Sequence, residues 1–256
     1  MSRILKSESF EIEYKETEIK SDLLWESHCH AKYEIITVLE GDISILLEGI
    51  GYRLKAGQSA IVPPLCYHTI IANKGGQYKR ITVLFELDAV PAPLRGHLSG
   101  KDIPLTVFAS SVSDELQTIC RKSADGYYTP LAESLIVHML YEYADADHAP
   151  IAPVADKEIA MMLKYIDEHL SDKIYLDDLA TYTACSKSTV CHVFREKMKI
   201  SPKQYILRKK LALADKMISE GVAPTIAAIR IGYDNYSDFY RVYRKLYNRS
   251  PKSGAE

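Results

Sequence analysis

The sequence predicts an α+β chain of two domains, in which an N-terminal β-barrel with C-terminal helices precedes an all-α domain with two helix-turn-helix motifs. The last hundred residues contain the same helix-turn-helix construction twice. Residues 21–87 contain short apolar runs between turn residues at roughly 8–12-residue spacing, which indicates a barrel or sandwich. A chain of 256 residues is also long enough for two domains. We therefore expect a first domain at 1–145, a linker at 146–156 and a second domain at 157–256.

The N-terminal half should consist of strands followed by two helices. Residues 1–20 mix Ile, Tyr and Glu in short alternation, which predicts one strand or a loose arm. Apolar runs that end at turn residues predict strands at 33–39, 43–47, 59–62, 67–72 and 78–87. Residues 88–108 contain scattered Pro and Gly and should be irregular, and helices are expected at about 112–122 and 130–144. Pro150 and Pro153, between small residues, mark the linker.

The first helix-turn-helix is predicted between Leu176 and Pro202. Acidic residues begin a short helix, and Ser186 is a good N-cap for the helix that follows. Val190, Val193 and Phe194 of that second helix recur at helical spacing and should be buried. The outer face then carries polar side chains that suit a major groove and its phosphate rim, namely Lys187, Ser188, Cys191, His192 and Arg195.

The second copy repeats the aromatic-Arg-x5-Ser-Pro ending of the first, 49 residues later. Asn235 is the expected N-cap of its second helix, after a turn at Gly232. The residues expected to be buried along this helix are Phe239, Val242, Tyr243 and Leu246. The residues expected to face outward are Tyr236, Ser237, Tyr240, Arg241 and Arg244.

A helix should connect the two motifs. Ser201 and Gln204 form a capping box with Pro202 at the first helical position, and the helix is expected to end near Ser219. Such a helix spans roughly 25–27 Å. With the widths of the reading helices added, this length suits two helices held near one DNA turn apart, about 34 Å.

The duplicated motif resembles the arabinose-operon regulator (AraC/XylS) family of bacterial transcription factors, over about residues 158–251. The resemblance implies that both second helices read adjacent major-groove segments through Ser188, Cys191 and His192 in the first and Tyr236, Ser237 and Arg241 in the second. It also implies double-stranded promoter DNA as a partner, with RNA polymerase as a further one. Ala184, Lys199 and Asn248 stand where the family usually has Gly, and Pro224 stands where it has a buried aliphatic residue.

The charge distribution supports a polyanionic partner for the second domain. Residues 157–256 hold 18 Lys and Arg against 12 Asp and Glu, whereas residues 1–156 hold 14 against 22. The net charge of −2 therefore conceals a basic half and an acidic half. The alternative is that these basic side chains only solvate a helical surface, and for Ser188 or Cys191 alone that alternative is as good as a base contact.

A second constellation lies in the predicted barrel, where His28, His30 and Glu34 are followed by His68. The spacing of these residues, with Gly41, Gly57 and Pro63 at set intervals, resembles the two motifs of the cupin superfamily over residues 23–87. Alternate residues of a strand share one face, so the four side chains should meet inside the barrel. In cupin enzymes such residues hold a divalent metal. The alternatives are that they bind a small-molecule effector, or that they hydrogen-bond only to one another.

Two cysteines and one helix have open interpretations. Cys29, between two His, should point away from the cluster, and Cys66 is either an extra soft ligand or a small buried thiol. The helix at 130–144 has one stripe made of Leu131, Leu135, His138 and Met139. This stripe either pairs with its copy in a second subunit, which the family resemblance favours, or covers the barrel.

Together these features predict a DNA-binding transcription regulator that responds to a small-molecule effector in its barrel, and not an enzyme. The alternative is a metal-dependent cupin oxygenase or isomerase with a DNA-binding tail. Five Cys without a Cys-x-x-Cys pair fit a reducing cytoplasm, and the N-terminus lacks the apolar segment of a signal peptide. The sequence has no run of about 18 apolar residues, so we expect no membrane partner.

Overall fold

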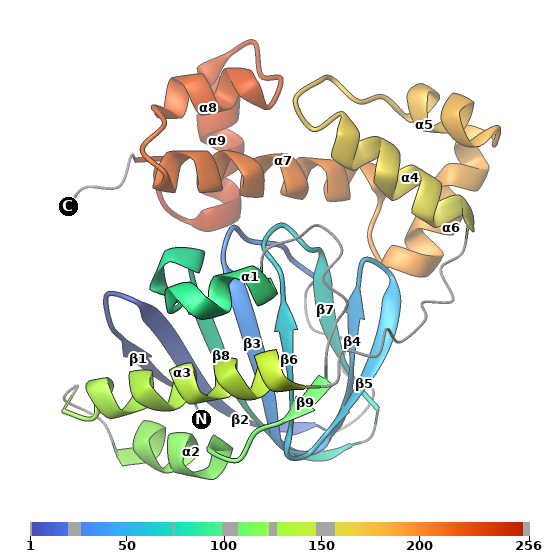
Figure 1. Ribbon diagram of the computed structural model, residues 1–256. Helices are drawn as coiled ribbons and strands as arrows, with labels where there is room; N and C mark the ends of the chain where they lie inside the picture. The colour runs from blue at the N-terminus through green and yellow to red at the C-terminus, as the bar shows by residue number, and fades with distance from the viewer. Residues whose placement is uncertain are drawn as a thin grey trace.

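The computed structural model describes residues 2–19, 27–73, 75–98, 107–122, 127–146 and 157–252. The strands and three helices form the N-terminal part, and the remaining helices form a C-terminal part that lies across one end of the strands (Figure 1). The predicted linker at 146–156 lies outside the described residues except for Ala146.

Two antiparallel sheets make up the β-rich part. The larger sheet has the strand order β1-β2-β8-β3-β6-β9, and the smaller has the order β5-β4-β7. The strands, in chain order, are β1 Ser2–Lys6, β2 Phe10–Ile19, β3 Tyr33–Glu40, β4 Asp42–Leu47, β5 Ile50–Lys55, β6 Gln58–Val62, β7 His68–Ala72, β8 Gly76–Phe85 and β9 Val107–Ala109. The five strands predicted after residue 30 are present, with ends shifted by a few residues.

Two strand predictions need correction. Residues 2–19 form two paired strands instead of one strand or a loose arm, and β2 pairs with β8 along its whole length. The strand β5 was not predicted. Only Tyr52 and Leu54 of β5 are buried, so its alternation of apolar and polar residues is too short to be recognised in the sequence.

The region 88–108 is less irregular than its Pro and Gly content suggests. It contains two 3-10 turns, at Leu87–Ala89 and Ala92–Leu94, and the one-turn helix α1 at Arg95–Leu98. The strand β9 begins at Val107 and pairs with β6. Residues 99–106 lie outside the described part of the chain.

The helices α2 (Ser113–Lys122) and α3 (Thr129–Asp145) confirm the two predicted helices and share a hydrophobic core with the larger sheet. The predicted stripe on α3 divides between two faces. Leu135 and Met139 are buried in that core, whereas Leu131 is 51% exposed and His138 is also exposed. The stripe therefore covers the barrel with one edge only, because its positions span more of the helix circumference than one contact face.

Within residues 157–252, the regular secondary structure of the C-terminal part consists of helices joined by turns and loops. Its helices are α4 Lys157–Glu168, α5 Leu176–Thr183, α6 Lys187–Met198, α7 Pro202–Ser219, α8 Pro224–Arg230 and α9 Tyr236–Tyr247. The predicted N-caps are confirmed, since Ser186, Ser201 and Asn235 each accept a hydrogen bond from a backbone N–H of the following turn. Across the described residues, we find no helix with the length and apolar character needed to cross a membrane.

Burial follows the predicted helical stripes with one error. Val190 and Phe194 of α6 are fully buried, as are Phe239 and Tyr243 of α9. Leu246, expected to be buried, is 37% exposed. The buried stripe of α9 runs instead from Tyr243 to the partly buried Tyr247, four residues on, which keeps it on one face of the helix.

The barrel and the first helix-turn-helix share one hydrophobic core. Cys29 and Tyr67 of the barrel belong to the same cluster of buried residues as Phe194 of α6 and Tyr205 of α7. The second helix-turn-helix has a separate core built from α7, α8 and α9. The barrel and the first motif are therefore in direct contact through this shared core.

Candidate functional sites

The outer face of α6 carries the residues predicted to read DNA. Ser186 caps the N-terminus of α6, and the residues predicted to contact DNA begin directly after this cap. Lys187, Ser188, His192 and Arg195 are exposed, and Cys191 is partly buried. Four of these predicted residues line one hollow on the surface, together with Glu196: Ser188, Cys191, His192 and Arg195.

The outer face of α9 is arranged in a similar way. Tyr236, Ser237, Arg241 and Arg244 are exposed, as predicted. Tyr240 is partly buried, and its hydroxyl lies 3.2 Å from the hydroxyl of Ser250. Tyr240 is therefore partly engaged in holding the C-terminal end of the motif.

Acidic residues on or beside both reading faces were not anticipated. The carboxylate of Asp177, from α5, lies 2.6 Å from the ammonium of Lys187. The carboxylate of Asp238 lies 2.7 Å from the guanidinium of Arg241. Both pairs are exposed, so they contribute little stability and exchange readily for a phosphate or a base edge. The Asp238–Arg241 pair could be found from its i,i+3 spacing, but the Asp177–Lys187 pair needs the fold.

A buried lysine on α7 joins the two motifs. Lys210 is 8% exposed, and its ammonium donates to the carbonyl of Ile231 at 2.7 Å and to the carbonyl of Asp172. Asp172 precedes α5 in the first motif, and Ile231 follows α8 in the second. Gly232 fits against this junction, since an added Cβ would lie 3.2 Å from the lysine nitrogen. The connection between the motifs is thus more than the helical rod predicted from sequence.

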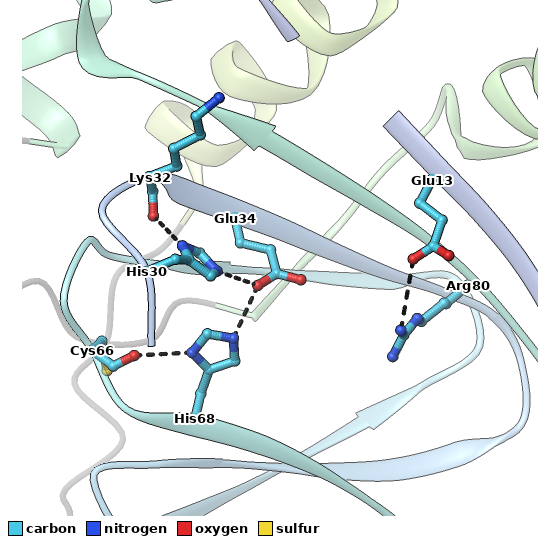
Figure 2. Close-up of polar contacts among 7 residues, drawn as sticks. All are labelled: Glu13, His30, Lys32, Glu34, Cys66, His68 and Arg80. Carbon is cyan, nitrogen blue, oxygen red and sulfur yellow. Dashed lines mark hydrogen bonds and ion pairs between the residues drawn. The ribbon is translucent and has the colours of Figure 1, made fainter. Parts of the chain in front are cut away.

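The four predicted barrel residues do come together. One ligand atom from each of His28, His30, Glu34 and His68 lies within 4.8 Å of the others. Glu34 is on β3 and His68 begins β7, and the segment that holds His28 pairs with His68 through two backbone hydrogen bonds of 2.9 Å. Figure 2 shows His30 and His68 pointing from two different directions toward the same carboxylate oxygen of Glu34.

The contacts of the two histidines indicate which ring nitrogen carries the proton. The Nδ1 atoms of His30 and His68 each lie 2.9 Å from a backbone carbonyl oxygen, of Lys32 and Cys66 respectively. A carbonyl only accepts hydrogen bonds, so each Nδ1 carries a proton. In the neutral ring the lone pair is then on Nε2, and both Nε2 atoms face Glu34 Oε2, at 3.0 and 2.9 Å.

This donor set fits a divalent cation. Two lone pairs and a carboxylate oxygen around one point repel each other unless a cation lies among them or the rings are protonated. Atoms that share one ion at about 2.1 Å lie roughly 3 Å apart, which is the distance of Glu34 Oε2 from the Nε2 atoms of His30 and His68, and the four donor atoms all lie within 4.8 Å of one another. Backbone carbonyls that fix the other ring nitrogen are the usual outer contacts of metal-bound histidines.

Without a cation, the charges must be balanced by the rings themselves. Burial opposes ionisation of Glu34, but the contacts with His30 and His68 outweigh it and hold the pKa of its carboxyl well below the usual value. Burial likewise opposes protonation of His68, but Glu34 beside it raises the pKa of His68 above the usual value. Without a metal ion, the cluster therefore favours an ionised Glu34 beside a protonated His68.

The two cysteines near the cluster have no ligand position. Cys29 is buried in the core shared with the helices, on the side away from the cluster, as predicted. Cys66 packs beside the barrel core, and burial raises the pKa of its thiol well above the usual value. Its carbonyl, not its sulfur, meets His68. The small buried thiol is thus the better interpretation of Cys66.

Sequence reasoning missed a polar pair on the same sheet face as Glu34. Arg80 of β8 lies 4.0 Å from Glu13 of β2 (Figure 2). Glu34 pairs with Leu84, and Arg80 is four residues from Leu84, so both side chains point to one face of the sheet. Strand alternation alone would have suggested this only if the register between β3 and β8 had been known.

Comparisons with known proteins match both parts of the chain. A family model described as the AraC-like ligand binding domain matches residues 16–140, and one described as a helix-turn-helix domain matches residues 179–254. Together these matches cover most of the 256 residues.

Two relatives extend over nearly the whole chain. The probable transcriptional regulator LumQ of Photobacterium leiognathi is 25% identical, and the match covers 88% of this chain and 89% of that protein. The HTH-type transcriptional regulator YbfI of Bacillus subtilis is 27% identical, with coverage of 82% and 80%. Both are regulators of transcription, in agreement with the expectation that this chain is not an enzyme.

Among solved structures, unsaturated fatty acid-bound ToxT of Vibrio cholerae covers 96% of this chain and 94% of its own, at 10% identity and a TM-score of 0.44. A probable AraC family regulator from Rhodopseudomonas palustris covers 38% of this chain and 93% of its own. Its identity is 25% and its TM-score 0.35.

Proposed function

Because the chain belongs to the AraC family of helix-turn-helix transcription regulators and carries that family's ligand-binding domain, we propose that it reads a specific promoter sequence and responds to a small molecule held in its barrel. The DNA-binding helices are α6 and α9, and the sensing site is the cluster of His28, His30, Glu34 and His68. The observation that carries the proposal is that one chain presents two N-capped, polar-faced helices beside a barrel with a preformed polar cluster.

The base contacts that we propose come from exposed side chains on both helices. Arg195 of α6 and Arg241 of α9 carry charge to the groove and its phosphates, and Ser188, His192, Tyr236 and Ser237 supply the neutral contacts. Lys187 at the start of α6 and Arg244 near the end of α9 are also exposed, and we assign phosphate contacts to them. Cys191 and Tyr240 are partly buried, so each exposes less of its side chain for contact with DNA.

Selection from a random duplex library tests the DNA half of the proposal. The full chain is incubated with duplexes that contain a long randomised region, and the bound fraction is sequenced over several rounds. We expect enrichment of two short boxes about one helical turn apart, one for each reading helix. Enrichment of a single box, or of none, would contradict the paired reading.

We also propose that the cluster holds a divalent metal ion, which the donor set and the carbonyl-bound Nδ1 atoms support. A bound ion supplies a positive charge to which an oxygen or nitrogen of an effector could bind. The chain's own part is to present lone pairs from His28, His30 and His68 and one carboxylate from Glu34. The protein then senses the effector without chemical conversion.

Metal content and metal affinity test this second part. Purified protein is analysed for metal, and Zn²⁺, Ni²⁺ and Mn²⁺ binding is measured by calorimetry after chelation. We expect one ion per chain, lost in His68→Ala and retained in His138→Ala, a matched change on the exposed face of α3. Equal affinity in both variants would show that the cluster only hydrogen-bonds within itself or to an effector.

We further propose a homodimer in the cytoplasm, bound at a promoter with RNA polymerase nearby. Support comes from the outer face of α3, where Leu131 is 51% and Tyr141 is 46% exposed. The two residues lie on the same side of α3, separated by exposed Ser134 and His138. Sedimentation of the wild type and of Leu131→Glu tests this, since the variant should be monomeric.

A further inference from the structure

Two segments of the barrel carry the polar cluster on one face and the helical part on the other. In the first segment, His28 and His30 belong to the cluster, while Cys29 between them is 7% exposed and packs in the core of the first helix-turn-helix. In the second, His68 belongs to the cluster, while Tyr67 is 2% exposed and packs in the same core. Adjacent residues of extended chain point to opposite faces, so each segment is a shared wall.

Aromatic contacts continue from this wall into the reading helix. The ring of Tyr67 lies 5.1 Å from the ring of Tyr205 on α7, and that ring lies 5.1 Å from Phe194 on α6. Tyr205 and Phe194 are fully buried. A displacement of Tyr67 must therefore move α6 or α7, because a packed core has no free volume to absorb it.

A polar contact closes the same boundary. Glu48 lies in the turn between β4 and β5, and its carboxylate accepts from the amide of Tyr67 at 2.8 Å, the hydroxyl of Tyr205 at 2.6 Å and the ammonium of Lys209 at 3.0 Å. Lys209 is 5% exposed and also donates to the carbonyl of Leu65 at 2.9 Å. One carboxylate of the barrel thus holds two side chains of α7.

The balance of charge keeps this contact ionic. Burial lowers the pKa of Lys209, but the carboxylates of Glu48 and Asp167 more than offset it and raise that pKa above the usual value. Asp167, on α4, lies 3.0 Å from the same ammonium. Lys209 therefore joins α4, α7 and the barrel at a single point.

The turn that carries Glu48 also touches the reading helix directly. Gly49 has a φ of +81°, and a Cβ added to it would lie 2.9 Å from the sulfur of Met198 at the end of α6. Glycine is thus needed here for both its backbone conformation and its small size. The turn approaches α6 as closely as a backbone can.

We propose that Glu48 and Lys209 form a latch that unites the barrel and the first helix-turn-helix into one cooperative unit, so that occupancy of the polar cluster is transmitted across the shared wall to α6. This inference rests on the proposed function for the identity of the site. It adds the route by which that site acts, which runs through Cys29 and Tyr67 to α7. Coupling of this kind requires only that whatever binds to the cluster favour one position of these two barrel segments relative to α7.

Calorimetric melting of the full chain tests the latch without any ligand. We expect one transition in the wild type and two in Glu48→Gln, in Lys209→Met and in the double variant, separated by about 5 °C or more. The effects of the two single changes should be less than additive in the double variant, because each change by itself removes the shared Glu48–Lys209 ion pair. Hydrogen exchange at β3 and α7 assigns each transition to its part of the chain.

The matched control is Glu40→Gln, which removes a carboxylate paired with Lys79 within the barrel. This variant should still melt in one transition. Two transitions in the wild type, or one transition in the double variant, would overturn the latch.

Added Zn²⁺ tests the route from the cluster. In the wild type and in Glu40→Gln, zinc should raise the single transition, whereas in the double variant it should raise only the barrel transition. An equal rise of both transitions in the double variant would overturn the route. If zinc shifts nothing in the wild type, the proposed metal site is wrong and the route from it fails, while the latch is still judged by the zinc-free melting.

Discussion

Three residues at helix ends adopt a backbone conformation that usually belongs to glycine. Ala184, Lys199 and Asn248 have φ values of 54°, 57° and 53° and follow α5, α6 and α9. These are the positions where the sequence departs from its family's Gly. The left-handed geometry is therefore kept without the residue that adopts it most easily, and Ala and Lys bear a steric cost that Asn partly avoids.

Ala184→Gly should stabilise the chain. The left-handed conformation costs a residue with a Cβ about 1–2 kcal/mol, and glycine removes this cost. The added freedom of Gly in the unfolded chain offsets only part of the resulting stabilisation. We expect a gain of about 0.5–1 kcal/mol in the free energy of unfolding, measured with urea. The control is Ala180→Gly within α5, which should destabilise by about 1 kcal/mol. A loss at position 184 would mean that its backbone relaxes in solution.

Arg241→Ala should weaken specific DNA binding by about 1–3 kcal/mol, the usual scale for a base contact. Arg241 is exposed on α9, where it pairs with the exposed carboxylate of Asp238, so it is accessible to a groove. Binding to the duplex selected by the wild type is measured by fluorescence anisotropy at fixed salt. Lys216→Ala, on the surface of α7, is the control and should bind normally. An unchanged affinity for Arg241→Ala would mean that another face of α9 reads the DNA.

At the scale of single elements, α8 provides a sharp contrast between neighbouring positions. Ala228 is 1% exposed and lies in the core of the second motif, whereas Ile229 beside it is 65% exposed. Ala228→Glu should destabilise the motif by several kcal/mol, because it buries an unpaired charge. Ile229→Glu should be tolerated. Thermal melting of both variants checks this, and a normal melting curve for Ala228→Glu would contradict the packing of α8.

The junction between the two motifs depends on one ammonium group. Replacing Lys210 with Met removes the donor from the carbonyls of Asp172 and Ile231, which should cost about 1–3 kcal/mol of stability. The mutual orientation of α6 and α9 should also loosen. We expect Lys210→Met to lose affinity for two boxes at the selected spacing, but to discriminate less against duplexes with one or two base pairs inserted. Lys209→Met, one residue earlier, should keep the spacing preference.

The helix-turn-helix motifs were predicted well because the contacts that define their helices join residues close together in the sequence. Ser186, Ser201 and Asn235 cap their helices through contacts within three residues, so their roles can be read from adjacent sequence. The strand β5 was not predicted, and Leu246 was wrongly expected to be buried, because both outcomes depend on which face of the element contacts the rest of the fold. The α3 stripe was assigned two alternatives, and the fold buries one edge of it and exposes the other.

At the scale of the whole molecule, the separated charges should make DNA binding strongly dependent on salt. The basic half begins at residue 157, and the acidic half contains the barrel. Because phosphate contacts release counterions, log K should fall linearly with log salt, with a slope near −0.9 for each phosphate contact. Anisotropy titrations from low to physiological salt measure this. A flat line would count against DNA binding by both motifs. The Arg241→Ala variant should keep the wild-type slope if its contact is to a base, whereas loss of a phosphate contact would make the slope shallower by about one unit.

The kinds of structure present can be recognised from neighbouring residues alone: two capped helix-turn-helix motifs, a barrel, and a His and Glu set at cupin-like spacing. Each rests on neighbouring residues, whose spacing dictates which side chains share a face. The contact between Glu48 and Lys209, 161 positions apart, and the burial of Cys29 and Tyr67 in the core of the first helix-turn-helix arise only when the chain folds. Such contacts depend on how two hydrophobic surfaces dock, and no local spacing encodes that docking. The proposed sensing cluster and the proposed reading helix are therefore recognisable separately in the sequence, but the segments that join them come together only in the folded chain.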